Sequence, residues 1–263
     1  MEEGLGARHS STLNGMLLPP GKQPAVAVVL EGSAAASPAW QAATWLLCEL
    51  VSRGLGHASA LTIVTADANS VIPLPGAAVG EAFGPALMTR SAAIGGVPAA
   101  LESAAPPNAI TVRVGPGATA ANLEVIADNW AGGVRVPGEA PHLGLEEPSL
   151  LIGSLIGACH AAAALFRQAR LSTPPVDGVW HDAWPLRLSN LTSAGPSAGL
   201  DHADLNLDHL ALAGMGAVGN AFVLAALTHP GARGTLRAAD YDHIDLTNLN
   251  RCLLFTRDHL GQL

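Results

Sequence analysis

The stretch GMGAVGNAFVLAALTHPGARGTLRAADYDHIDLTNLNR, residues 214–251, decides the fold of the C-terminal part of this 263-residue chain. It opens with the pattern G-x-G-x-x-G, formed by Gly214, Gly216 and Gly219, directly after a short apolar run typical of a strand. An apolar segment typical of a helix follows. Glycines between a strand and a helix let backbone N–H groups approach a phosphate at the positive end of the helix dipole. The pattern therefore predicts a nucleotide-binding strand–helix–strand unit.

The second strand of this unit is predicted over GTLRAAD, which ends on Asp240. Asp240 follows Gly219 by about 20 residues, the spacing at which an acidic side chain hydrogen-bonds a ribose hydroxyl. A carboxylate at this position disfavours NADP, because it would repel the 2′-phosphate. NAD and ATP fit the pattern equally well up to this point.

The block that follows, DYDHIDLTNLNRCLLFTRDHLGQ, distinguishes between the two nucleotides. With it, the chain over about 210–262 resembles the adenylyltransferase superfamily of ubiquitin-activating enzymes and their bacterial ThiF-like relatives in thiamine and molybdopterin biosynthesis. That superfamily combines a glycine loop, a D-x-D at the end of the second strand and an S/T-N-L-N/Q-R block. The matching residues here are Asp240, Asp242 and the segment 247–251. The sequence departs at Cys252, where the family usually has Gln.

The resemblance implies a set of ATP contacts. Gly214, Gly216 and Gly219 would lie beneath the nucleotide, with Asp240 on the ribose and Asp242 beside it. Asn248 and Arg251 would reach the phosphates, and Asn250 would orient the arginine; these three residues complete the implied site. Arg251 is the predicted catalytic residue, because a guanidinium fork can grip phosphate oxygens and offset charge as pyrophosphate departs. Taken without the glycine loop, N-L-N-R would instead indicate a capped turn with a solvated arginine.

The reaction implied by the resemblance is attack of a C-terminal carboxylate on the α-phosphate of ATP, with Mg²⁺ compensating charge. The partner would be a ubiquitin-like protein, a sulfur-carrier protein or a peptide. The family's phosphate-contacting lysine and magnesium-handling aspartate are absent from this chain, so we expect a truncated, inactive form with no metal ligands. It would associate as a homodimer or with a missing C-terminal portion. The alternatives are an NAD-binding Rossmann oxidoreductase and a catalytically silent nucleotide-binding or scaffold module.

The expected fold class is α/β, with two Rossmann-like parallel-sheet domains of which the second is incomplete. We expect a loose lead-in over 1–23, an α/β domain over 24–171, a linker over 172–206 and the nucleotide-binding domain over 207–263. In the first domain, strands are predicted at 24–32, 60–68, 109–115 and 132–138, with helices at 37–54 and 146–171. Residues between 69 and 108 are rich in Gly, Pro and Ala and give no clear pattern.

The first domain has no G-x-G-x-x-G after its first strand, so no nucleotide loop is expected there. Its order of elements favours a degenerate adenylation-like domain, and an unrelated α/β domain fits about as well.

Composition narrows the remaining classes of function. The net charge is −8 and no basic run is present, which argues against nucleic-acid binding. The most apolar stretch, 150–166, is shorter than the roughly 20 residues that span a bilayer, so no membrane segment is expected. Cys48, Cys159 and Cys252 indicate reduced thiols in the cytoplasm. The ten histidines are scattered, and no metal site is expected.

Overall fold

A computed structural model of the chain describes residues 23–53, 58–141, 143–144, 146–171, 178–182, 187–191, 194, 204–229 and 231–262. The expected lead-in over 1–23 lies outside the described residues except for its last residue. Within the described part, no helix has the length and apolar character needed to cross a membrane.

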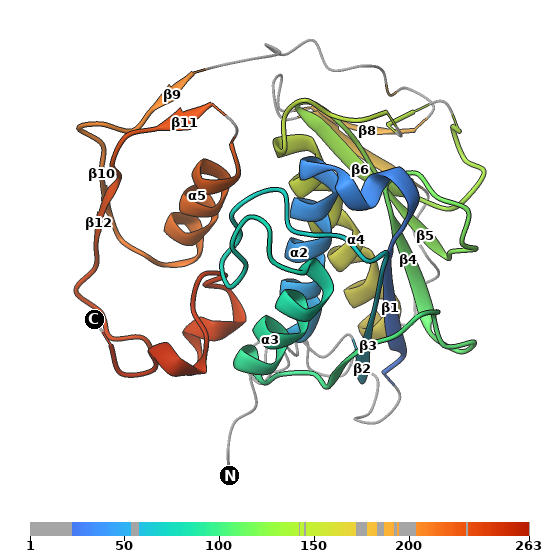
Figure 1. The fold of residues 1–263 in the computed structure, drawn as a ribbon, viewed down its shortest axis with the longest axis horizontal. Helices are drawn as coiled ribbons and strands as arrows, with labels where there is room; N and C mark the ends of the chain where they lie inside the picture. Colours follow the sequence, from blue (N-terminus) through green and yellow to red (C-terminus); the bar gives the residue numbers. More distant parts are fainter. Residues whose placement is uncertain are drawn as a thin grey trace.

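An eight-stranded sheet with the order β3-β2-β1-β4-β5-β6-β7-β8 forms the centre of the N-terminal part (Figure 1). The first five strands of this order pair in parallel, which confirms the predicted Rossmann-like α/β class. The strands are β1 Ala25–Leu30, β2 Ala60–Thr65, β3 Ala99–Leu101, β4 Ile110–Val114, β5 Leu123–Asp128, β6 Ala131–Arg135, β7 Val179–Asp182 and β8 Arg187–Asn190.

Strand β1 lies between β2 and β4, and its sequence AVAVVL explains that place. Val26 to Leu30 are fully buried, so both faces of the strand are covered. A continuous apolar run, rather than an alternating one, is what a central parallel strand requires.

Three helices pack together and against the sheet: α2 Pro38–Ser52, α3 Phe83–Ile94 and α4 Ile152–Leu171. Helix α2 begins where the sequence predicts, because Ser37 accepts a hydrogen bond from the Trp40 amide and Pro38 occupies the first turn. It lies between the other two and contacts both, and α4 covers β5 and β6 (Figure 1).

The sheet departs from the expected all-parallel arrangement on one side. Strands β5, β6, β7 and β8 pair antiparallel. Only Asn129 and Trp130 separate β5 from β6, and such a short connection permits a hairpin but not a parallel crossover. Strands β7 and β8 come from the segment 172–206, which was expected to serve only as a linker. Helix α3 and strand β3 occupy the stretch that gave no clear sequence pattern.

The C-terminal lobe, defined here as the described residues of 204–262, contains a small strand–helix–strand unit. Strand β10 (Ala211–Ala213) leads into helix α5 (Ala217–Thr228), and β12 (Arg237–Ala239) returns to pair in parallel with β10. Two further short strands, β9 (Leu205–Asn206) and β11 (Ala232–Arg233), also pair in parallel. The unit has the order of elements that the glycine pattern predicts.

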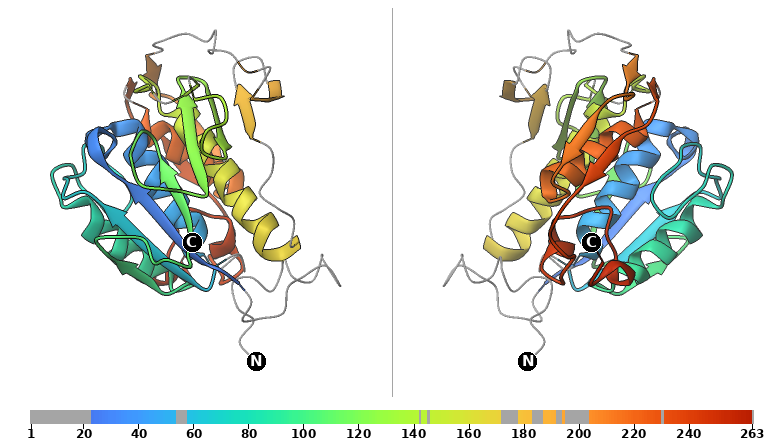
Figure 2. Two further views of the ribbon diagram at one scale, coloured as in Figure 1. Left: turned by 90° about the vertical axis from the view of Figure 1, so that its right-hand side faces the viewer. Right: turned by 90° about the vertical axis from the view of Figure 1, so that its left-hand side faces the viewer.

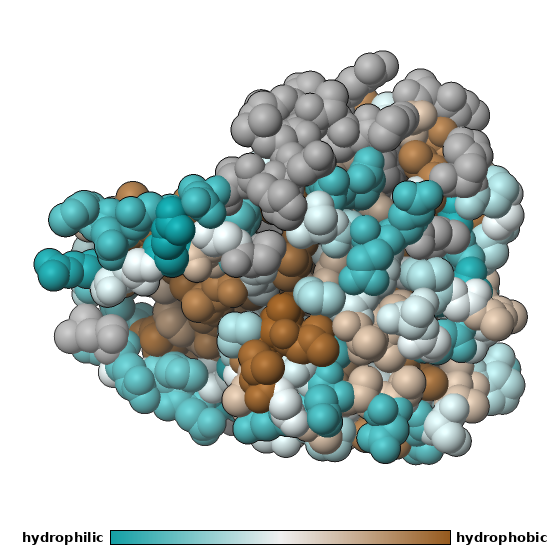
Figure 3. All heavy atoms as spheres, turned by 45° about the horizontal axis from the view of Figure 1, so that its top comes forward, coloured by the Kyte–Doolittle hydropathy of each residue, from teal (hydrophilic) through white to brown (hydrophobic). Residues whose placement is uncertain are grey.

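The lobe lies beside α2 and α3, as two perpendicular views show (Figure 1, Figure 2). Two short 3-10 helices, η2 (Asn248–Asn250) and η3 (Arg257–His259), follow the strand–helix–strand unit, and η3 contacts α3. Helix α5 is apolar except for Asn220 and Thr228, and it leaves Val218, Phe222 and Leu227 exposed. On the left of Figure 3, apolar residues line the inside of a hollow, and more hydrophilic residues lie above and below it.

Candidate nucleotide-binding site

The three glycines of the loop are required for different physical reasons. Gly214 has a φ of +94°, a left-handed conformation that favours glycine, and its amide donates to the Ala239 carbonyl at 2.8 Å. Gly219 lies so close to Gly214 that an added Cβ would run into the Gly214 carbonyl oxygen. An added Cβ at Gly216 would meet no heavy atom within 4 Å. The fold itself therefore needs Gly214 and Gly219, whereas Gly216 keeps open the space in front of the α5 N-terminus.

Asp240 connects the end of β12 to the glycine loop. Its Oδ2 accepts a hydrogen bond from the Met215 amide at 2.6 Å, and its Oδ1 accepts from the amides of Tyr241 and Asp242 at 2.7 and 3.1 Å. The amides of Asp242 and Met215 lower the pKa of the Asp240 carboxyl, because they stabilise its ionised form. The Asp242 side chain is exposed, and its backbone amide is the part of this residue that contacts Asp240.

This pKa shift predicts how the loop responds to acid. The pKa of Asp240 in the folded chain lies below its unfolded value of about 3.9. The ionised carboxylate therefore stabilises the folded loop fully above the unfolded pKa, and this stabilisation is lost as the pH falls through the folded pKa. The Met215 amide resonance, followed by NMR against pH, should therefore titrate with a midpoint below about 3.9. Asp240→Asn should abolish this titration. A midpoint at or above the ordinary aspartate value would contradict the anchoring role.

The block after the second strand folds as a tight turn. The Asp245 amide donates to Asn248 Oδ1 at 2.7 Å, and the Asn248 amide donates to Asp245 Oδ1 at 3.0 Å. The Thr247 hydroxyl also donates to Asp245, which with the Asn248 amide lowers the pKa of the Asp245 carboxyl. The Asn248 side chain thus forms a hydrogen bond within its own turn. Asp245, which organises the turn, is missing from the sequence-predicted site.

Arg251 is held at the end of this turn. Its Nη1 donates to the Thr247 carbonyl at 2.7 Å and to Asn250 Oδ1 at 3.2 Å. Asn250 is buried, so it forms a fixed support for a guanidinium that remains partly exposed. Both contacts use Nη1, and a guanidinium offers five N–H donors in all.

Asn220 brings the two halves of the motif together and is absent from the sequence-predicted site. Its Nδ2 donates to the carbonyls of Met215 and Gly216 at 2.5 and 3.1 Å. Its Oδ1 accepts from the Leu254 amide at 2.8 Å, 34 residues along the chain. The side chain is fully buried. A single amide side chain in the first turn of an otherwise apolar helix was the available signal.

Cys252 is buried directly after the N-L-N-R turn, and its burial raises the pKa of the thiol. The thiol is therefore a poor source of thiolate. Among the residues that the structure describes, no group of three or more His, Cys, Asp or Glu side chains is placed to hold a metal ion.

The N-terminal sheet has its own topological switch point, between β1 and β4, where ligands bind in many α/β folds. Glu31, at the end of β1, lies there. Its carboxylate accepts hydrogen bonds from the amide and the hydroxyl of Thr119, at 2.6 and 2.8 Å. Burial acts to raise its pKa, but the amides of Thr119 and Ala118 outweigh it and lower the pKa overall. A fixed negative charge here is unfavourable for a phosphate.

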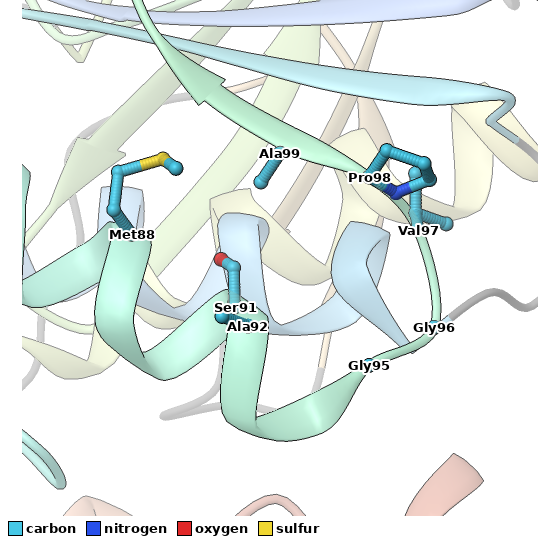
Figure 4. A pocket seen from close by; sticks show the side chains of 8 residues that line it. All are labelled: Met88, Ser91, Ala92, Gly95, Gly96, Val97, Pro98 and Ala99. Atoms are coloured by element: carbon cyan, nitrogen blue, oxygen red, sulfur yellow. The ribbon is translucent and has the colours of Figure 1, made fainter.

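A pocket of 340 Å³ lies elsewhere, between α3 and the turn into β3 (Figure 4). Its lining contains no charged side chain and none of the sequence-predicted residues, so it is separate from the candidate nucleotide site. It is lined by Met88, Ser91, Ala92, Gly95, Gly96, Val97, Pro98 and Ala99.

The strand–glycine loop–helix unit, the anchoring aspartate and the N-L-N-R turn thus lie together in the C-terminal lobe. Residues 192–263 match the family model described as the ThiF family, so this part of the chain is ThiF-like and the resemblance stated from the sequence is confirmed.

A larger part of the chain is also similar to solved structures. Escherichia coli MccB aligns with a TM-score of 0.53 and 11% identity, over 77% of this chain and 75% of that chain. E. coli MccB with SeMet MccA aligns with a TM-score of 0.47 and 11% identity, over 68% of this chain and 66% of that one. For that complex the chain spans slightly less than two thirds of the matched structure. At this identity the likeness concerns the fold. No curated protein matches the chain.

Proposed function

We propose that the C-terminal lobe binds ATP as part of an adenylyltransferase that activates a C-terminal carboxylate. The observation that carries this proposal is the junction at Asn220, which bonds both the glycine loop and the chain just beyond Arg251. A phosphate-binding loop and an arginine-bearing turn are thereby fixed to one buried side chain. An NAD site needs the loop but has no need of the turn.

The open space at Gly216 fits a phosphate. A backbone without Cβ atoms allows close approach, and the N-terminus of α5 adds partial positive charge at the same place. An ionised carboxylate has about four acceptor positions, and three amides occupy three of those on Asp240. The remaining position can accept a hydrogen bond from a ribose hydroxyl, so Asp240 fits the role of ribose ligand. Asp242 would lie at the margin of the same site, and Asn248 would contribute by shaping the turn.

Arg251 would compensate the charge that develops as pyrophosphate departs. Asn250 and the Thr247 carbonyl restrict the guanidinium, so that little side-chain freedom remains to be lost on binding. Mg²⁺ bound to the ATP phosphates would supply further compensation.

The proposed reaction joins a carboxylate oxygen to the α-phosphorus of ATP while the bond from that phosphorus to the bridging oxygen breaks. The products are an acyl adenylate and pyrophosphate. The substrate class is the C-terminus of a peptide, a ubiquitin-like protein or a sulfur-carrier protein. We place the reaction in the cytoplasm, where ATP is available and the three free thiols stay reduced. We further propose that the N-terminal domain is a degenerate adenylation domain, which the carboxylate of Glu31 at its switch point supports.

Calorimetric titration of the chain with ATP and with NAD tests the proposal. We expect ATP to bind more tightly, and Arg251→Ala to weaken ATP binding about tenfold, since a charge-assisted hydrogen bond contributes about 1.5–3 kcal/mol. Arg233→Ala is the matched control, because Arg233 is exposed and pairs with Asp204 at the surface. Tighter binding of NAD, unaffected by Arg251→Ala, would overturn the proposal.

A second assay addresses the chemistry. Pyrophosphate exchange into ATP, dependent on an added peptide or carrier protein, is the direct readout of reversible adenylate formation. We expect exchange from the complete adenylyltransferase, and not from this chain alone. Exchange should also require the free C-terminal carboxylate, so an amidated C-terminus provides the control.

A further inference from the structure

A buried charged cluster lies where the N-terminal domain meets the C-terminal lobe. Glu49 of α2 pairs through Oε2 with Arg53 Nη2 and through Oε1 with Arg90 Nε, both at 2.5 Å. The three side chains are between 0% and 9% exposed. Arg53 follows the last residue of α2, and Arg90 lies on α3.

The two guanidinium groups extend from this cluster to the backbone of the C-terminal lobe. Arg53 donates to the carbonyls of Leu249 at 2.5 Å and Leu253 at 2.7 Å, and to that of Phe255 at 3.3 Å. Arg90 Nη2 donates to the same Leu253 carbonyl at 2.7 Å. Leu249 lies inside the N-L-N-R turn, and Leu253 comes two residues after it.

The charges in the cluster do not balance within the N-terminal domain. Two guanidinium groups face one carboxylate, which leaves one positive charge in excess. A buried charge is costly unless it is compensated by hydrogen bonds or an opposite charge. The carbonyls of Leu249, Leu253 and Phe255 supply that compensation, so the cluster and the turn stabilise each other.

A second set of contacts runs in the opposite direction. Arg257, in η3 of the C-terminal lobe, donates to the carbonyls of Ile94 and Gly95 at the end of α3, at 3.2 and 3.1 Å. Gly95 is labelled in Figure 4, at the point where α3 ends. The segment from 249 to 257 is therefore attached to the N-terminal domain at both of its ends.

We propose that Arg53, assisted by Arg90, positions the N-L-N-R turn so that Arg251 meets the nucleotide phosphates. The N-terminal domain thereby fixes the conformation of the nucleotide site in the C-terminal lobe. This proposal rests on the proposed ATP-binding function. Arg53 is a positioning residue, because its N–H groups donate to the backbone of the turn, whereas Arg251 is the residue proposed to contact the nucleotide.

The test compares Arg53→Met, Arg53→Lys and the surface control Arg233→Met in the full chain. Hydrogen exchange measured by mass spectrometry reports the order of residues 248–256, with β4 and β5 as an internal reference for the fold. In Arg53→Met we expect exchange over 248–256 to be at least tenfold faster, with the reference unchanged and the Kd for ATP raised at least tenfold. Arg53→Lys keeps the charge but loses the fork, so it should restore part of both losses.

Arg90→Met keeps the fold measurable if loss of Arg53 unfolds the chain, because Arg90 makes a single contact with the lobe backbone, at Leu253. It should change both readouts in the same direction by a smaller factor. Unchanged exchange over 248–256, or faster exchange with an unchanged Kd for ATP, would overturn the positioning role. A natural chain that binds no ATP would instead overturn the proposed function, and faster exchange in Arg53→Met would still establish that Arg53 orders the turn.

Discussion

Gly216→Ala is expected to fold with the stability of the natural chain and to bind ATP about 100-fold more weakly, the equivalent of losing one or two charge-assisted hydrogen bonds. Gly216 has a φ of −68°, which alanine adopts without strain, and an added Cβ would meet no protein atom within 4 Å. The new methyl group would instead occupy the open space at the N-terminus of α5. Calorimetric titration with ATP and urea unfolding measure the two effects separately.

Gly219→Ala is the matched comparison at the same loop. An added Cβ there runs into the Gly214 carbonyl oxygen, so the helix must move away from β10. We expect the free energy of unfolding to fall by about 1–3 kcal/mol, as for other overpacked sites, and ATP binding to weaken as a consequence. If Gly216→Ala bound ATP as tightly as the natural chain, the open space at Gly216 would have no part in phosphate binding.

The elements that could be predicted from the sequence are those with strong local patterns. The apolar run of β1 and the Ser37–Pro38 start of α2 can be recognised from the local sequence alone. Strands β6, β7 and β8 carry no comparable signal for direction, because antiparallel pairing depends on the turn between β5 and β6 and on which strand lies nearby. Helix α3 was missed because its Gly, Pro and Ala content obscures the helical period.

The candidate site likewise contains some residues that the local sequence predicts and others that it does not. The glycine loop and Asp240 follow from a known spacing within one strand–helix–strand unit, and the structure brings them together through the Met215 amide. Asn220 and Arg53 act on partners 34 and 196 residues away, at Leu254 and Leu249. Contacts over such separations are set by how the two parts of the chain pack, and a single sequence contains no pattern for them.

Asn220→Leu is expected to lower the free energy of unfolding by about 2–4 kcal/mol, measured by urea denaturation. The substitution keeps the number and branching of the side-chain heavy atoms but removes three hydrogen bonds, to the carbonyls of Met215 and Gly216 and from the Leu254 amide. Each such bond contributes about 1 kcal/mol, and buried groups left without a partner add to the loss. ATP binding should weaken with it, because the glycine loop is no longer fixed to the segment that follows Arg251.

Asn206→Leu provides the control for this prediction. Asn206 is exposed, and its side chain accepts one hydrogen bond, from the Asp208 amide at 2.9 Å. Its replacement should change stability by no more than about 0.5–1 kcal/mol, since solvent can replace the lost partner. Equal losses in the two variants would mean that burial and the link to Leu254 contribute nothing, and Asn220 would then be an ordinary helix residue. A loss of stability confined to Asn220→Leu, accompanied by weaker ATP binding, would show that the nucleotide site depends on the hydrogen bonds of this amide.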